Sequence, residues 1–180
     1  MMACSEESYE ISEAHADLKL ISADNNFELV AFVDADWAGD VDGRKSTSGY
    51  LFRLGQSTVS WSSKKQASVA LSSTEAEYIS AAYASQEAVW LRQLLDDLGV
   101  PVTHPVVMYE DNQGCIKLAS SEKMNARTKH IDIRHHLCDL INHDVIEFVY
   151  CQTDKMIADA LTKPLPRPKF EELRTVMGIV

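Results

Sequence analysis

The sequence lacks the features of several large classes of protein. No run of about 18 apolar residues occurs, so we expect no membrane span, and the acidic first residues do not resemble a secretory signal. Only 7 Gly and 5 Pro occur beside 46% hydrophobic residues, which excludes a disordered or collagenous chain. The four cysteines form no C-x-x-C pair, which argues against a disulfide framework and favours a reduced, intracellular protein.

Positive charge is also scarce. Lys and Arg number 17 against 27 Asp and Glu, a net charge of −10 that argues against a general binder of polyanions. One stretch differs, because residues 117–136 hold five bases and only two acids. Arg127, Lys129 and Arg134 in this stretch are candidates for contacts to a nucleic-acid backbone, and a solvated helix face is the alternative.

The hydrophobic pattern predicts a row of strands followed by alternating helices and strands. The expected strands are 27–33, 48–54, 57–61, 105–109 and 145–151, with a further short strand at 18–21. The expected helices are 75–98, 112–120, 128–142, 154–163 and 169–177. This order predicts an α/β fold with a five-stranded mixed sheet, three antiparallel strands and then two parallel ones, flanked by helices.

The chain divides into three parts on the same pattern. Residues 1–16 have no clear period, and we expect a flexible N-terminal segment. Residues 17–165 form the predicted domain. A linker with three prolines at alternate positions from Pro164 then leads to a C-terminal helix within residues 166–180.

Four acidic residues occupy related places in this topology. Asp34 follows the first long strand, and Asp111 follows the strand at 105–109. Glu77 lies in the first turns of the long helix, and Asp159 lies in the helix after the fifth strand. Because sites in open sheets form beyond the carboxyl ends of adjacent strands, we expect the four carboxylates to converge.

Converging carboxylates repel one another and require a cation to stay ionised. Hard oxygen ligands select Mg²⁺ or Mn²⁺, and a pair of such ions suits in-line phosphoryl transfer. Each acid also has a structural interpretation, because Asp34 can end a strand, Asp111 can cap a helix and Asp159 can be solvated. Four acids at matching places in the topology indicate a metal site more strongly than any one of them alone.

Several longer blocks surround these acids. They are DADWAGD (34–40) with RKSTSGY (44–50), LSSTEAEY (71–78), DNQ (111–113), RTKHIDIR (127–134) and ADALTKPL (158–165). In this order they resemble the ribonuclease H domain of copia-type LTR retrotransposon polyproteins. The resemblance implies a ribonuclease H-like fold and hydrolysis of the RNA strand of RNA–DNA hybrids.

The resemblance also implies a D-E-D-D site for two Mg²⁺ or Mn²⁺ ions. Asp34, Asp111 and Asp159 match three of its positions. The glutamate is ambiguous between Glu75 and Glu77, which point about 200° apart on a helix. We favour Glu77, because Ser72 and Glu75 form a capping box, although the rival box of Thr74 and Glu77 leaves the choice open.

Substrate and partners follow from the same resemblance. The partners would be the hybrid and the reverse transcriptase module of the same polyprotein, in the cytoplasm, in virus-like particles or in the nucleus. Ser73, Thr74 and Gln113 lie where helices begin and are candidates for contacts to the hybrid, with helix capping as the alternative. The alternative function is a catalytically silent, domesticated or fragmentary nucleic-acid-binding module. A phosphatase built on Asp34 and Asp36 lacks the expected residues after them.

Overall fold

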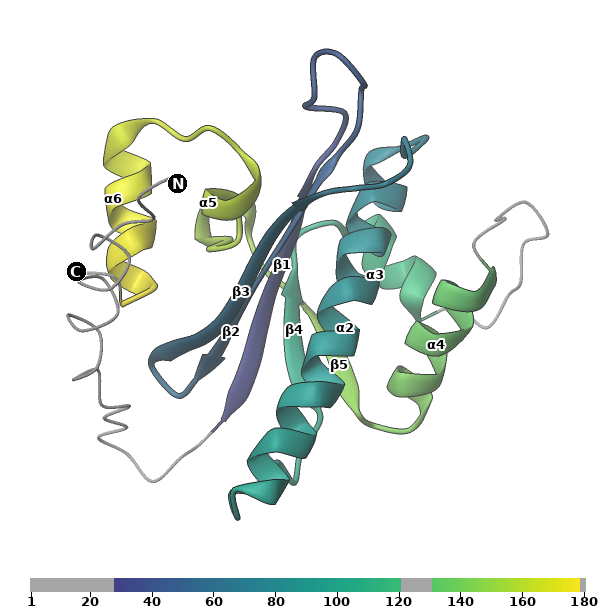
Figure 1. The fold of residues 1–180 in the computed structure, drawn as a ribbon, viewed down its shortest axis with the longest axis vertical. Helices are drawn as coiled ribbons and strands as arrows, with labels where there is room; N and C mark the ends of the chain where they lie inside the picture. Colours follow the sequence, from purple (N-terminus) through teal and green to yellow (C-terminus); the bar gives the residue numbers. More distant parts are fainter. Residues whose placement is uncertain (1–27, 121–130, 179–180) are drawn as a thin grey trace, which may run out of the picture.

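The computed structural model describes residues 28–120 and 131–178, which contain a five-stranded sheet in the order β3-β2-β1-β4-β5 (Figure 1). The strands are β1 (Leu29–Asp36), β2 (Thr47–Leu54), β3 (Ser57–Lys65), β4 (Val106–Glu110) and β5 (Ile146–Tyr150). The first three pair antiparallel, and β4 and β5 continue the sheet in parallel with β1. The predicted mixed sheet is therefore confirmed. The predicted segments at 1–16 and 18–21 lie outside the described residues.

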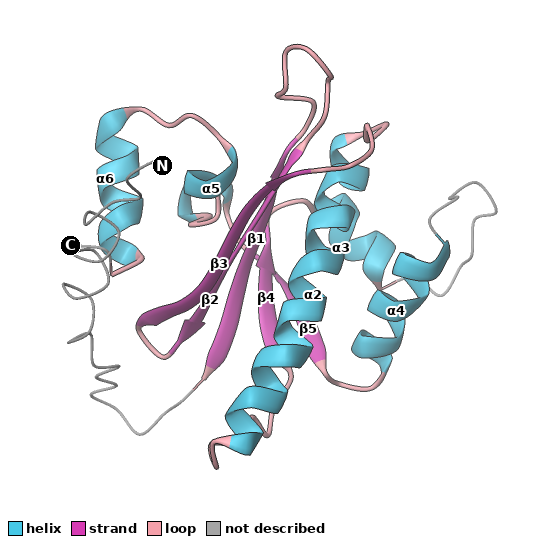
Figure 2. Cartoon of the chain, in the orientation of Figure 1, coloured by secondary structure: helices cyan, strands magenta, loops and turns pink. Residues whose placement is uncertain are grey.

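Helices cover both faces of this sheet (Figure 2). They are α2 (Ser73–Asp97), α3 (Gln113–Ala119), α4 (Ile131–Asn142), α5 (Asp159–Thr162) and α6 (Arg167–Val176), with a short 3₁₀ turn η1 (Thr153–Lys155). The views place α2, α3 and α4 on one face and α5 and α6 on the other. Within the described residues, no helix combines the length and apolar character needed to cross a bilayer.

The main hydrophobic core lies between the sheet and α2. Alternate residues of β1 contribute Leu29, Ala31 and Val33, because side chains of a strand point to opposite faces in turn. On α2, Ala81 and Ala84 are fully buried in the same core. Small side chains at these positions bring the helix close to the sheet and leave β1 little freedom to move.

The opposite face has a smaller apolar cluster. Leu51 of β2 packs with Ile157 and with Met177, which follows α6. The hydroxyl of Thr58 also donates a hydrogen bond of 2.7 Å to the main-chain oxygen of Met177. The C-terminal helix is therefore held against β2 and β3.

Three predicted elements differ clearly from the structure. The strand expected at 57–61 continues to Lys65 as β3. The first strand was expected to end before Asp34, but β1 continues to Asp36. The single helix expected at 154–163 is wrong, because the chain forms η1, an extended residue at Met156 and then the four-residue α5. Met156 and Ile157 turn inward and are buried, and their burial interrupts the helix.

Candidate functional site

Asp34 is the centre of the candidate site and is completely buried. It pairs with Gly49 of β2, and β1 runs parallel to β4 on its other side. The hydroxyl of Ser80 on α2 donates to the main-chain oxygens of Asp34 and Gly49, at 2.9 and 3.2 Å. This contact fixes the backbone under the Asp34 carboxylate to the helix that carries Glu77.

Three of the four predicted carboxylates meet. Asp34, Glu77 and Asp111 each present a carboxylate oxygen, and these oxygens lie within 4.8 Å of one another. Glu77 is buried like Asp34, whereas Asp111 is half-buried. The group of candidate ligands is thus rich in oxygen and comes from three places in the fold, which are β1, α2 and the segment after β4.

The two glutamates of α2 have different environments. Ser72 caps the helix by accepting a hydrogen bond from the Glu75 amide at 3.2 Å, and Glu75 Oε2 accepts one from the Leu71 amide at 2.7 Å. Glu75 thus folds back over the helix start, as in a capping box. Glu77, two residues on, faces Asp34 and Asp111.

Gln66 ties this first turn of α2 to the sheet. Its side-chain amide is buried and donates to the Ser48 hydroxyl at 2.8 Å and to the Ala76 carbonyl at 2.9 Å. Ala76 directly precedes Glu77. The contact therefore positions the Glu77 backbone relative to β2.

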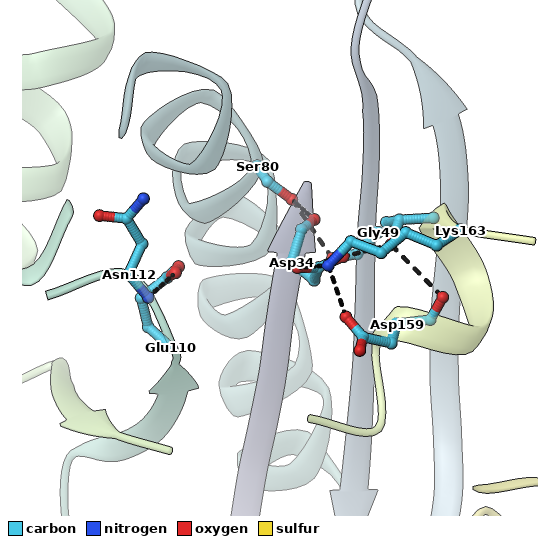
Figure 3. Close-up of polar contacts among 8 residues, drawn as sticks. Asp34, Gly49, Ser80, Glu110, Asn112, Asp159 and Lys163 are labelled. Atoms are coloured by element: carbon cyan, nitrogen blue, oxygen red, sulfur yellow. Dashed lines mark hydrogen bonds and ion pairs between the residues drawn. The ribbon is translucent and has the colours of Figure 1, made fainter. Parts of the chain in front are cut away.

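Asn112, not Asp111, caps the next helix. Asn112 Oδ1 accepts from the Cys115 amide at 3.0 Å, which leaves the Asp111 carboxylate available to the site. The preceding residue, Glu110, is fully buried, and its Oε1 accepts from the Asn112 amide at 3.0 Å (Figure 3). Glu110 thus braces the turn that carries Asp111.

Sequence reasoning missed Glu110. The available signal is its place in β4, where Val106 and Met108 point inward at alternate positions and Glu110 continues the series. A glutamate at a core position of a strand is unusual, because burial of an unpaired carboxylate is costly.

Burial and mutual repulsion favour the protonated forms of the acidic groups in the site. Burial, with repulsion from Glu110, Asp34 and Asp111, raises the pKa of Glu77 to about 11. Burial also raises the pKa of Glu110 to about 8. One oxygen of each, Oε2, is buried with no hydrogen-bond partner among the described residues. A bound proton or a cation would satisfy such an oxygen.

Asp159 lies on the other side of Asp34 and outside the group of three. Lys163 joins the two, because its Nζ lies 3.0 Å from Asp34 Oδ1 and 2.7 Å from Asp159 Oδ1 (Figure 3). The Thr162 hydroxyl donates to the second oxygen of Asp34. Both partners stand in the ADALTKPL block, but the sequence alone assigned neither a role.

Gly49 makes this approach of α5 possible. A Cβ atom built at Gly49 would lie 2.5 Å from Thr162 Cγ2 and 3.1 Å from Leu161 Cβ. Any side chain there would push α5 off the sheet. The glycine of the RKSTSGY block thus serves close packing beside Asp34.

The candidates for substrate contacts are only partly described. Ser73 and Gln113 are exposed, and Thr74 Oγ1 lies 3.5 Å from Asn112 Oδ1, so α2 and α3 begin beside each other. Arg127 and Lys129 lie outside the described residues. Arg134 lies in α4, in the part whose side chains are not described.

No family model matches the chain. It is 42% identical over 157 residues to the retrovirus-related Pol polyprotein from transposon RE2 of Arabidopsis thaliana, and 43% identical over 152 residues to that from transposon TNT 1-94 of Nicotiana tabacum. These matches cover 87% and 84% of the chain. The chain spans 11% of the length of each relative.

Solved structures agree on the fold. The N-terminal RNase H domain of rv2228c from Mycobacterium tuberculosis aligns with a TM-score of 0.57 at 11% identity, over 83% of this chain and 97% of that one. LC11-RNase H1, solved with an RNA/DNA hybrid, gives 0.54 at 15% identity, over 75% of this chain and 94% of that one.

The chain therefore has the ribonuclease H fold. The resemblance to the ribonuclease H domain of copia-type retrotransposon Pol polyproteins is confirmed by the polyprotein relatives together with this fold.

Proposed function

We propose that the chain is a metal-dependent ribonuclease H that cleaves the RNA strand of RNA–DNA hybrids. The observation that carries this proposal is the meeting of Asp34, Glu77 and Asp111 within 4.8 Å in a ribonuclease H fold. The proposed site consists of these three residues and Asp159. A structure of LC11-RNase H1 holds an RNA/DNA hybrid, which supports the choice of substrate.

The donor set fits Mg²⁺ or Mn²⁺. The candidate ligands are carboxylate oxygens, which hard divalent cations prefer, and Glu77 Oε2 is buried with no hydrogen-bond partner in the described part of the chain. Asp34, Glu77 and Asp111 would hold one ion, and Asp34 with Asp159 the other. When bound, two such ions would activate a water molecule and stabilise the leaving 3′-oxygen.

The surrounding residues hold these ligands in place before any ion binds. Ser80 fixes the backbone of Asp34, Gln66 fixes the turn before Glu77, and Glu110 braces the turn of Asp111. Such prior ordering lowers the reorganisation needed in the reaction.

The substrate would lie over the edge where α2 and α3 begin. Ser73, Thr74 and Gln113 are proposed to contact the hybrid there, with backbone contacts from Arg127, Lys129 and Arg134. The Pol polyprotein relatives support a reverse transcriptase module as partner and an intracellular site of action, in the cytoplasm, virus-like particles or nucleus.

The decisive experiment compares two identical substitutions two residues apart. Labelled RNA–DNA hybrid is incubated with Mg²⁺ or Mn²⁺ and with the wild type, Glu77→Gln or Glu75→Gln. We expect Glu77→Gln to lower the cleavage rate at least about a hundredfold, because it removes a negative ligand of the proposed ions. Glu75→Gln keeps an oxygen for the Leu71 amide and should leave the rate nearly unchanged.

Binding of the hybrid is measured in parallel with Asp111→Asn. Cleavage that disappears while binding persists supports the enzyme. Equal binding by wild type and variant with no cleavage in either would instead support the silent nucleic-acid-binding module. Phosphate release from a small monoester would point to a phosphatase.

A further inference from the structure

Lys163 divides the carboxylates into two unequal halves. On one side, Asp34 faces Glu77 and Asp111, and no Lys or Arg pairs with those two residues in the ion pairs of the described residues. On the other side, the Lys163 ammonium lies between Asp34 and Asp159 and bonds to one oxygen of each. Among the described residues, the first half therefore has no basic side chain paired with Glu77 or Asp111, whereas the second half already has its cation.

We infer that Lys163 is a built-in counter-ion that competes with a divalent ion for the Asp34–Asp159 half of the site, so that metal loads in order. This inference rests on the proposed function. The half formed by Asp34, Glu77 and Asp111 takes the first ion. The second ion binds only when the ammonium leaves.

The position of the ammonium supports competition. A cation held by Asp34 Oδ1 and Asp159 Oδ1 has to occupy the place where Nζ lies, because Nζ is already within 3.0 Å of both oxygens. A divalent ion and an ammonium that both contact these two oxygens would also lie close together and would repel each other strongly. The two cations therefore exclude each other.

The Lys163 side chain can also reach solvent. Its side chain is 32% exposed, whereas the Asp34 side chain is fully buried. A lysine carries a compact charge on a flexible four-carbon stem, so the ammonium can swing into solvent without moving α5. In the metal-free protein the same ammonium compensates the charge of a buried aspartate, so its loss has a cost in stability.

The metal-free protein is titrated with Mn²⁺, and free Mn²⁺ is followed by its electron paramagnetic resonance signal. The titration gives the number of Mn²⁺ sites and the affinity of each. The wild type should bind one ion more tightly than the other. In Lys163→Met the weaker site should tighten at least about tenfold, because a competing charge is gone, and the stronger site should change by less than about threefold. Lys163→Arg, which keeps the charge, should not tighten the weaker site.

A second readout and a matched control separate this role from general effects. Without metal, Lys163→Met should unfold at a lower temperature than the wild type, and Mn²⁺ should restore more of its stability. Lys65→Met removes a lysine that pairs with Asp40 at 2.8 Å and should leave both affinities unchanged. If Lys163→Met does not fold, Lys163→Gln keeps a hydrogen-bond donor without the charge and answers the same question.

Equal Mn²⁺ affinities in Lys163→Met and the wild type would overturn this inference alone. So would unchanged affinities with a raised KM for the hybrid, which would assign Lys163 to the substrate phosphates. Absence of Mn²⁺ binding in both proteins would overturn the metal site itself, and with it the proposed function.

Discussion

The two faces of the sheet are built differently, and the neighbouring residues Leu51 and Phe52 of β2 point one to each. Phe52 joins the large core under α2, and Leu51 joins the small cluster with Ile157 and Met177. The α2 face thus contributes most of the buried apolar surface. The α5 face has a smaller apolar cluster, and Thr162 and Lys163 add polar contacts to Asp34.

Asp34 is held from both faces. Ser80 of α2 binds its backbone, and Thr162 and Lys163 bind its side chain. The well-packed α2 face therefore supplies the rigid part of the site. We expect the thinner face to supply the part that would adjust if ions and substrate bind as proposed.

The largest effect is expected at Phe52. Phe52→Ala removes a fully buried ring from the main core and should lower the free energy of unfolding by about 3–5 kcal/mol. Urea denaturation followed by circular dichroism measures this loss. A loss below about 1 kcal/mol would mean that the α2 face is not the main source of stability.

Leu51→Ala should cost less stability but affect the site more. We expect about 2–3 kcal/mol, because the smaller cluster can partly close around the cavity. Hybrid cleavage, assayed where both variants remain folded, should fall further in Leu51→Ala than in Phe52→Ala, since α5 and its Asp159 lose support. Equal activity in the two variants would remove the functional distinction between the faces.

Gly49→Ala tests the contact between β2 and α5 directly. The added methyl group clashes with Thr162, so we expect a loss of about 1–3 kcal/mol and a fall in cleavage of about a hundredfold from the displaced site. Gly99→Ala is the control. Its φ of +78° disfavours alanine by about 1–2 kcal/mol, but no atom of the site is near. It should therefore lose stability and keep its activity.

The smallest effect concerns Glu110, an acidic residue buried on the apolar face. Its pKa of about 8, like that of Glu77 at about 11, lies above the ordinary value of 4.5 because of burial. The folded state therefore holds protons that the unfolded state releases. Stability of the metal-free protein should fall as the pH rises from about 5 to 8.

Glu110→Gln should weaken this pH dependence and stabilise the metal-free protein by about 1 kcal/mol at pH 8. Melting temperatures at pH 5 and pH 8, with and without MgCl₂, measure both effects. Mg²⁺ should raise the wild-type melting temperature more at pH 8 than at pH 5, because fewer protons then have to leave the carboxylates when the ion binds. An identical pH slope in Glu110→Gln would contradict the role of this residue.

The sequence predicted what depends on local pattern. Alternation located the strands, capping residues located the ends of α2, and topology grouped Asp34 with Asp111. The capping pattern favoured Glu77 over Glu75 and left the choice open. These features are set by neighbours in the chain or by the carboxyl ends of strands.

The sequence did not predict what depends on distant contacts. Lys163 follows a four-residue helix, and its two partners become evident only once α5 lies beside β1. The break at Met156 has the same cause, because burial of this residue outweighs local helix propensity. The role of Glu110 was not predicted, because no short-range rule indicates that a glutamate in the core supports the turn after its strand.

The contact between Thr162 and Asp34 joins residues 128 positions apart. During translation, Asp34 is synthesised early, and Lys163, which pairs with it, is synthesised much later. A premature stop codon between β5 and α5 would therefore leave the five described strands but would remove the cation that pairs with Asp34. Such a product would lose both Asp159, the fourth proposed ligand, and Lys163, the counter-ion of Asp34, in a single event.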